Sequence, residues 1–188
     1  MSTNKGRLYI ISAPSGAGKG TVISRLLELM PSLVFSVSAT TRAPRPGEID
    51  GVSYSFVTRE LFMKMIADEE FLEYAEYVGE FYGTPKKPVY TSMENGKDIL
   101  LDIEVKGARQ VREKVRDAVS VFIVPPDMKE LERRLRGRGT DTEEKLIARL
   151  ERARLEMEEK SLYDHIVVND DVTRAAEEII TIIKKSRV

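Results

Sequence analysis

The feature that most constrains the fold is an apolar run that leads through a glycine-rich turn into a helix-like segment. Residues 8–12 form a short apolar run, as in strands that are buried on both faces of a sheet. Residues 21–30 carry apolar side chains at helical spacing, and Pro31 ends this segment. A strand, a tight turn and a helix in this order predict the first strand–helix unit of a parallel α/β sheet.

The turn between these two segments has the composition of a phosphate-binding loop. It consists of Ala13, Pro14, Ser15, Gly16, Ala17, Gly18, Lys19, Gly20 and Thr21. Gly16 and Gly18 allow successive backbone N–H groups to surround an anion, and the start of the following helix adds a partial positive charge. Lys19 supplies a cation for the β- and γ-phosphates. The alternative is an ordinary strand–turn–helix with a surface lysine.

The loop departs from the usual pattern G-x-x-x-x-G-K-[ST] at both ends. Ala13 stands at the first glycine position and Gly20 at the Ser/Thr position. Gly20 lacks the hydroxyl that usually contacts Mg²⁺, and Thr21 lies about 100° further round the helix, so it does not replace that hydroxyl. We therefore expect phosphates and water to hold the metal, and the sequence identifies no direct metal ligand.

Strand-like and helix-like segments alternate along most of the remaining chain. The predicted strands cover residues 35–38, 99–101, 119–124 and 166–168, and the predicted helices cover residues 105–115, 127–135, 146–157 and 172–183. Asp127 and Glu130 form a capping pattern at the start of the second of these helices. Residues 52–89 differ, because short aromatic runs surround a single helix there. The pattern predicts an α/β fold with a parallel sheet, helices on both faces and a small mixed insertion.

Composition excludes several classes of function. The chain has 188 residues, with 30 Lys and Arg against 31 Asp and Glu, which gives a net charge of −1. This balance argues against nucleic acid or an anionic membrane as a partner. The absence of cysteine and the single histidine, His165, exclude thiol catalysis and metal centres built on thiolates or several histidines. No apolar run approaches about 18 residues and the first residues are polar, so we expect a cytoplasmic location.

A second candidate anion site lies in residues 42–47. Arg42 and Arg45 are three residues apart, and Pro44, Pro46 and Gly47 mark this segment as a loop. Two guanidinium groups on a proline-stiffened loop suit the oxygens of a single phosphate. The alternative is a solvated loop without a ligand.

The chain resembles guanylate kinase from about Lys5 to Arg187. The segments that carry the resemblance are APSGAGKGT, SVSATTRAPRPGEIDGVSYSFV, FLEYAEYVGEFYGTP, ILLDIEVKG, GRGTDTEEKLIARL and IVVNDD. The glycine-rich loop and the segment GRGTDTEEKLIARL, taken alone, are nearly as similar to adenylate kinase. The resemblance implies a P-loop parallel-sheet core of residues 5–35 and 95–188. It also implies a helical lid at about residues 134–152 and an inserted α+β GMP-binding domain of residues 36–92.

The resemblance also implies roles for individual residues. By position, the phosphate of GMP would be held by Arg42, Arg45, Tyr54 and Tyr82, and its guanine and sugar would be surrounded by Ser38, Glu73, Thr84 and Glu104. Asp102 would lie beside the metal and the phosphates of the substrates. The loop residues 13–21, with Lys19, and Asn169 would bind ATP, and Arg134, Arg138 and Arg149 would close on its triphosphate. Glu104 stands where members of the family carry Asp, which adds a methylene to this side chain.

The implied activity is transfer of a phosphoryl group from ATP to GMP, which yields GDP and ADP by direct in-line displacement. ATP and Mg²⁺ are the implied cofactors, GMP and ATP the small-molecule partners, and dGMP is expected as a second acceptor. Two alternatives remain. The chain is a kinase for another nucleoside monophosphate such as AMP, or a non-catalytic guanylate-kinase-like binding module. The sequence identifies neither a protein partner nor an oligomeric state.

The chemistry of the residues agrees with this activity. Guanine presents N–H donors at N1 and N2 and an acceptor at O6, which match the carboxylate of Glu73 and the hydroxyl of Thr84. The attacking phosphate oxygen of GMP is already anionic, so no general base is needed and catalysis consists of positioning and charge neutralisation. In isolation, Glu73 would be a solvated strand carboxylate and Asp102 a helix cap.

Overall fold

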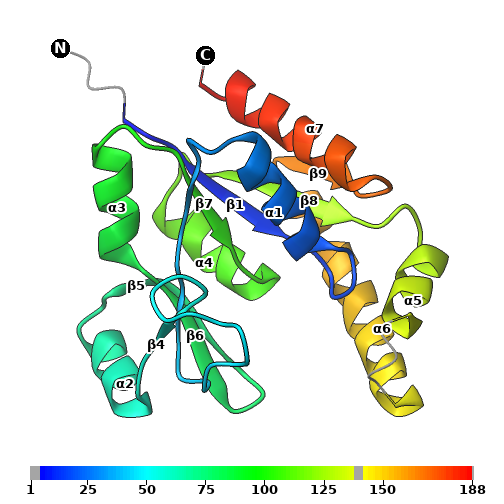
Figure 1. Ribbon diagram of the computed structural model, residues 1–188, viewed down its shortest axis with the longest axis horizontal. Helices are drawn as coiled ribbons and strands as arrows, with labels where there is room; N and C mark the ends of the chain where they lie inside the picture. Colours follow the sequence, from blue (N-terminus) through cyan, green and yellow to red (C-terminus); the bar gives the residue numbers. More distant parts are fainter. Residues whose placement is uncertain (1–4, 138–141, 188) are drawn as a thin grey trace. The chain divides into compact units, whose positions relative to one another are not determined.

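The computed structural model describes residues 5–137 and 142–187, which divide into two compact units (Figure 1). The first unit comprises residues 5–8, 34–101 and 106–118, and the second comprises residues 9–33, 102–105, 119–137 and 142–187. Each unit therefore brings together segments that lie far apart in the sequence.

The first unit contains a mixed four-stranded sheet with the order β4-β3-β6-β5. Its strands are β3 (Ala39–Thr40), β4 (Ser55–Phe56), β5 (Phe71–Tyr77) and β6 (Glu80–Pro85). Outside this mixed sheet, β2 (Val34–Phe35) pairs in parallel with β7 (Ile99–Asp102). The helices of this unit are α2 (Arg59–Ala67), α3 (Lys86–Glu94) and α4 (Val105–Lys114).

Aromatic side chains and strand pairing fix the mixed sheet. Phe62 of α2 stacks on Phe71 and Phe81, with ring centroids 4.5 and 5.4 Å apart. Strands β5 and β6 are antiparallel, and Glu73 lies opposite Thr84 in their register. Because side chains alternate along a strand, Thr84 and Tyr82 point to the same face of β6.

The second unit is built on parallel strands, with β8 (Val119–Val124) paired to both β1 (Leu8–Ser12) and β9 (His165–Val168). Its helices are α1 (Lys19–Leu29), α5 (Met128–Arg136), α6 (Glu143–Glu158) and α7 (Val172–Lys185), and a 3₁₀ turn at Glu159–Leu162 follows α6. Helices α1 and α7 lie side by side (Figure 1). All five residues of β1 are buried, as the apolar run predicts.

Helices α5 and α6 pack through a small apolar cluster of their own. Leu131 and Leu135 of α5 contact Leu146 and Ala153 of α6. At the start of α5 the backbone N–H of Glu130 donates to Asp127 Oδ1 over 2.7 Å, so the predicted cap is confirmed. None of the helices in residues 5–137 and 142–187 combines the length and apolar character needed to cross a membrane.

The α/β class and the parallel sheet predicted from the sequence are confirmed, with local differences. Of the segment predicted as a strand at 35–38, only Phe35 lies in a strand, β2, and residues 36–38 connect β2 to β3, which belongs to a different sheet. Helix α1 begins two residues earlier than predicted, at Lys19, directly after the left-handed Gly18. Helix α3 is not predicted by the sequence pattern. Its Pro88 lies in the first turn, where proline is tolerated because the N–H groups there have no partner within the helix.

Candidate active site

The phosphate loop of the second unit contains two glycines in a left-handed conformation, and neighbouring side chains leave no room for a Cβ on either. Gly16 and Gly18 have φ angles of 92° and 88°, in the left-handed region that favours glycine. A Cβ on Gly16 would lie 2.7 Å from Leu135, and one on Gly18 would lie 2.5 Å from the amide nitrogen of Asn169. No described side chain caps the start of α1, and its first turn contains no acid. The first N–H groups of α1 are therefore open to an anion.

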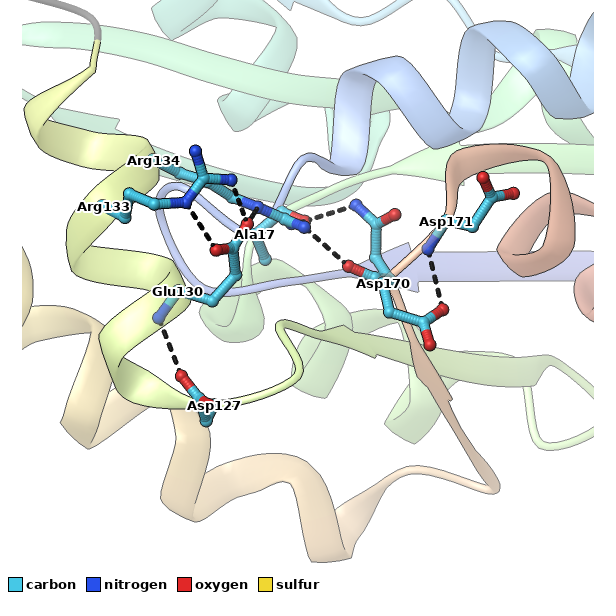
Figure 2. Close-up of polar contacts among 8 residues, drawn as sticks. Ala17, Asp127, Glu130, Arg133, Arg134, Asp170 and Asp171 are labelled. Carbon is cyan, nitrogen blue, oxygen red and sulfur yellow. Dashed lines mark hydrogen bonds and ion pairs between the residues drawn. The ribbon is translucent and has the colours of Figure 1, made fainter.

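The carbonyl oxygen of Ala17 holds this loop in place (Figure 2). It accepts a hydrogen bond from Asn169 Nδ2 over 2.7 Å and another from Arg134 Nη1 over 3.2 Å. Arg134 Nη2 also donates to the carbonyl oxygen of Asn169 over 2.9 Å. Arg134 thus connects α5, the phosphate loop and the segment that follows β9.

Glu130 orients the guanidinium group of Arg134 (Figure 2). Its Oε1 accepts from Arg134 Nε over 2.7 Å, and its Oε2 accepts from Arg133 Nε over 2.7 Å. The hydrogen bonds from Arg133 and then Arg134 lower the pKa of Glu130 from 4.5 to about 2. Glu130 is therefore ionised at neutral pH and engages Arg134 as a carboxylate.

Lys19 and Asp102 form an ion pair next to the loop. Lys19 Nζ lies 2.6 Å from Asp102 Oδ1 and 3.4 Å from the carbonyl oxygen of Ile103, to which it donates. Asp102 is the last residue of β7, as expected for a functional residue at the carboxyl end of a parallel strand. Both side chains are partly exposed, so the lysine remains accessible to an anionic ligand.

One face of α6 contacts Ser15 in the phosphate loop. Arg149 Nη2 donates to Ser15 Oγ over 3.0 Å, and the Ser15 N–H donates to Glu156 Oε2 over 3.1 Å. Arg152 bridges Glu156 Oε1 and Glu104 Oε2 with hydrogen bonds of 2.8 and 2.6 Å. Of the predicted residues, Arg149 therefore lies at the loop, and Glu104 is paired with Arg152.

In the first unit, Glu48 organises the arginine loop. Arg42 donates to both carboxylate oxygens of Glu48, over 3.0 and 2.8 Å, and the backbone N–H of Arg45 donates to Glu48 over 2.7 Å. The hydrogen bond with Glu48 raises the pKa of Arg42, and the hydrogen bond from Arg42 lowers the pKa of Glu48. The side chain of Arg45 is exposed, so its guanidinium is open to solvent.

Two tyrosines flank Arg42. The guanidinium carbon of Arg42 lies 5.5 Å from the ring centre of Tyr54. The rings of Tyr54 and Tyr82 meet edge to face with centroids 6.0 Å apart. A hydrogen bond with Tyr82 contributes to the raised pKa of Arg42 after the larger contribution of Glu48. The structure therefore brings Arg42, Tyr54 and Tyr82 together.

Glu73 and Thr84 form a buried polar pair on β5 and β6. Thr84 Oγ1 donates to Glu73 Oε1 over 2.6 Å, and only 5% of Glu73 and none of Thr84 is exposed. Tyr82 is two residues before Thr84 on β6, so it lies on the same face of that strand. The carbonyl oxygen of Ser38 accepts from the N–H of Ser55, which pins the segment before β3 to this sheet. Burial of a carboxylate costs free energy unless hydrogen bonds from the protein or from a ligand compensate for the lost solvation.

Sequence reasoning misses three acids that orient predicted site residues. Glu130 precedes Arg134 by four residues on one helix, a spacing that allows an ion pair. Glu48 pairs with Arg42 six residues before it in a loop, where no regular spacing indicates the contact. Glu156 follows Arg149 by seven residues and therefore lies on the same face of α6. The predicted residue Arg138 lies outside the described residues.

The residues present are compatible with a Mg²⁺ ion carried mainly by phosphates. Residues 5–137 and 142–187 contain no cluster of three or more acids or histidines of the kind that holds a metal. Asp102 is the single predicted carboxylate beside Lys19, and Gly20 leaves open space, with no atom within 4 Å of an added Cβ. Mg²⁺ commonly binds through one or two carboxylates and the phosphates of a substrate, so this donor set fits it.

Comparison with known proteins agrees with this arrangement. Residues 5–186 match the family model for guanylate kinase. The chain is 49% identical over 175 residues to a guanylate kinase of Synechococcus sp. (strain JA-3-3Ab), a match that covers 93% of this chain and 81% of the relative. It is 52% identical over 167 residues to one of Trichodesmium erythraeum (strain IMS101), which covers 89% of this chain and 90% of the relative.

A solved structure gives the same result for the fold. The crystal structure of guanylate kinase from Anaplasma phagocytophilum superposes with a TM-score of 0.81 at 36% identity, and the match covers 98% of this chain and 88% of that one. The sequence match extends through both units and includes the loop with Lys19, the Arg42 loop and the Glu73–Thr84 pair. The chain therefore belongs to the guanylate kinase family.

Proposed function

We propose that this protein transfers the γ-phosphoryl group of ATP to GMP and releases GDP and ADP. The observation that carries the proposal is the buried Glu73–Thr84 pair, since a carboxylate and a hydroxyl match the donors and the acceptor on the Watson–Crick edge of guanine. Membership of the guanylate kinase family supports the same acceptor.

The groups of the second unit act on ATP. The loop amides and Lys19 bind the β- and γ-phosphates, and Arg149 and Arg134 approach the loop from α6 and α5. Asn169 Oδ1 is buried without a hydrogen-bond partner among the described residues, while its amide nitrogen is held by Ala17. This acceptor is suited to an amino group, and the 6-amino group of adenine is the donor that ATP supplies.

The groups of the first unit act on GMP. Arg42, Arg45, Tyr54 and Tyr82 bind the phosphate, and Ser38, Glu73 and Thr84 bind the guanine or sugar. The bidentate contact between Arg42 and Glu48 keeps the guanidinium oriented before GMP arrives. Glu104 is also assigned to GMP. Its carboxylate accepts a hydrogen bond from Arg152, so it must bind GMP while it keeps this bond or after it gives the bond up.

The reaction needs no proton transfer to begin. An anionic oxygen of GMP attacks the γ-phosphorus, the bond between that phosphorus and the β,γ-bridging oxygen breaks, and ADP leaves with the electron pair. Lys19, Arg134, Arg138 and Arg149 neutralise the charge on the transferring group, and Arg42 holds the acceptor. Asp102 is the residue that would hold Mg²⁺, which would supply positive charge to the phosphates of ATP when bound.

We assign the acceptor domain to residues 36–92 and the core to residues 5–35 and 95–188, with the lid at about residues 134–152. Part of the lid lies outside the described residues. The described part carries Arg134 and Arg149, which already contact the phosphate loop. We include dGMP as an acceptor, because the proposed base contacts of Glu73 and Thr84 do not involve the sugar.

Formation of ADP from ATP and Mg²⁺ with GMP, dGMP, AMP, CMP and UMP in turn tests the proposal. We expect turnover with GMP and dGMP and little with the other acceptors. Faster turnover with AMP identifies a kinase for another monophosphate. No turnover with any acceptor, in a folded protein that binds neither nucleotide, identifies a binding module instead.

A further inference from the structure

Helix α4 fixes the position of strand β5 on both sides of Glu73. β5 is the last strand of the order β4-β3-β6-β5, so the sheet leaves one of its edges unpaired. Gln110 covers this edge, because its Nε2 donates to the carbonyl oxygen of Tyr74 over 3.0 Å and its Oε1 accepts from the N–H of Tyr74 over 3.3 Å. Lys114 Nζ donates to the carbonyl oxygen of Leu72 over 2.5 Å. Hydrogen bonds thus join α4 to β5 at Leu72 and Tyr74, the residues directly before and after Glu73.

Gly107 is the residue of α4 that faces the Glu73 carboxylate. It precedes Gln110 by three residues and Lys114 by seven, so all three lie on one face of the helix. A Cβ added to Gly107 would lie 2.4 Å from Glu73 Oε2 and 3.0 Å from its Cδ. Atoms do not approach this closely, so the carboxylate occupies space that exists only because residue 107 has no side chain.

Backbone conformation does not account for a glycine at this position. The glycines with positive φ are Gly16, Gly18, Gly47, Gly51, Gly79 and Gly96, and Gly107 is not one of them. Gly107 lies inside a helix, where alanine is the favoured residue and glycine a poor one. We therefore attribute the glycine at this position to the space that it leaves for the Glu73 carboxylate.

We propose that Gly107 is a positioning residue for base recognition, because it sets where the Glu73 carboxylate lies and thereby determines selectivity for guanine. Two ties hold α4 to β5, and Thr84 holds Oε1, so an added methyl group moves the flexible end of Glu73 rather than the helix or the strand. A displaced carboxylate no longer meets both N–H donors of guanine. The inference rests on the proposed function, since it takes Glu73 to be the group that reads the base.

The test is Gly107→Ala in the full chain, with kcat and KM measured separately for GMP and for ATP, together with kcat/KM for AMP and the Tm. We expect KM for GMP to rise at least about tenfold, in line with the loss of one charge-assisted hydrogen bond. The GMP/AMP ratio of kcat/KM narrows, KM for ATP changes less than about twofold, and the Tm is unchanged or higher, because alanine favours the helix. Glu113→Ala, on an exposed position of α4, is the matched control and changes none of these.

A rescue separates positioning from a structural role. Glu73→Asp shortens the side chain by one methylene and withdraws the carboxylate from residue 107. We expect Gly107→Ala to raise KM for GMP by less than about threefold in the Glu73→Asp background, so the two effects are not additive.

Three results overturn the inference. They are an unchanged KM for GMP in Gly107→Ala, an equal rise in KM for both nucleotides, and a protein that fails to fold, which would show that the helix and not the carboxylate gives way. Each is distinct from failure of the proposed function, which would appear as a wild-type protein that does not phosphorylate GMP.

Discussion

Lys19 Nζ lies 2.6 Å from Asp102 Oδ1, so the lysine of the phosphate loop carries its own counter-charge. A polyphosphate that binds at the loop must share or replace this contact. The pair also explains how a lysine is kept in one position without being buried, since an ion pair restricts a long, partly exposed side chain.

Lys19→Ala should reduce kcat/KM for ATP by at least about a hundredfold, because it removes a cation from the transferring phosphoryl group. The fold should persist, since Lys19 is not part of the apolar core. Steady-state kinetics with saturating GMP and a thermal melt measure the two effects. Lys64→Ala on the exposed face of α2 is the control, and unaltered kinetics in folded Lys19→Ala would reject the phosphate-loop assignment.

Replacement of Arg42 or Arg45 by alanine should raise KM for GMP and leave KM for ATP nearly unchanged. A charge-assisted contact of about 1.5–3 kcal/mol corresponds to roughly a ten- to hundredfold change. Arg42→Lys keeps the charge but loses the two-pronged geometry, so it should fall between wild type and Arg42→Ala. Equal losses for both nucleotides would assign the pair to ATP instead.

Glu73→Gln should lower kcat/KM for GMP and narrow the GMP/AMP ratio. Glutamine offers one acceptor and one donor where guanine requires two acceptors, whereas against adenine the loss of the charge removes a mismatch. Thr84→Val should cost less, because a neutral hydrogen bond contributes only about 0.5–1.5 kcal/mol. The measurement is kcat/KM of each variant with GMP and with AMP. An unchanged GMP/AMP ratio of kcat/KM in Glu73→Gln would mean that Glu73 does not recognise the base.

Glu130→Gln should destabilise the protein at neutral pH but not in strong acid. The pKa of Glu130 is lowered to about 2, so its contribution to the free energy of unfolding is complete above its ordinary value of 4.5 and is lost as the pH falls toward 2. Urea unfolding of wild type and variant between pH 7 and pH 3 measures the difference. It should be constant from pH 7 to about pH 5 and shrink below that.

Glu94→Gln, at an exposed position in α3, is the control for this series and should show no such trend. A difference between wild type and Glu130→Gln that has already vanished at pH 5 would contradict the assigned pKa. The same two proteins should differ in KM for ATP at neutral pH, because Arg134 loses the carboxylate that orients it.

The sequence predicts the strand–loop–helix unit and the parallel sheet because both depend on patterns of neighbouring residues. The buried β1 appears as an uninterrupted apolar run, and the cap of α5 appears as Asp127 followed by Glu130. The division of residues 34–40 between two sheets has no such local mark. It depends on distant partners, because the N–H of Ser36 donates to the carbonyl oxygen of Leu100 in β7, and the carbonyl oxygen of Ser38 accepts from the N–H of Ser55 in β4.

Placement of site residues follows the same rule. Lys19 and Arg42 are proposed from motifs and Glu73 from the resemblance to guanylate kinase, but the partners that the structure gives these residues are not predicted. Glu48 engages Arg42 only because the loop turns back on itself, and Gly107 faces Glu73 only because α4 covers the edge of β5. The sequence shows which residue types occur at which spacing. The tertiary structure determines which of many similar charged residues form a pair.

Arg134 contacts Ala17 and Asn169 through main-chain carbonyl oxygens, which every residue type presents alike. These two contacts are therefore indifferent to the identity of the side chains at 17 and 169, provided that the backbone keeps its path. Arginine alone offers several planar donors on one side chain, so no other residue at 134 reproduces the pair of bonds. A substitution of Arg134 therefore removes both of these contacts at once, whereas a substitution at 17 or 169 that preserves the backbone removes neither.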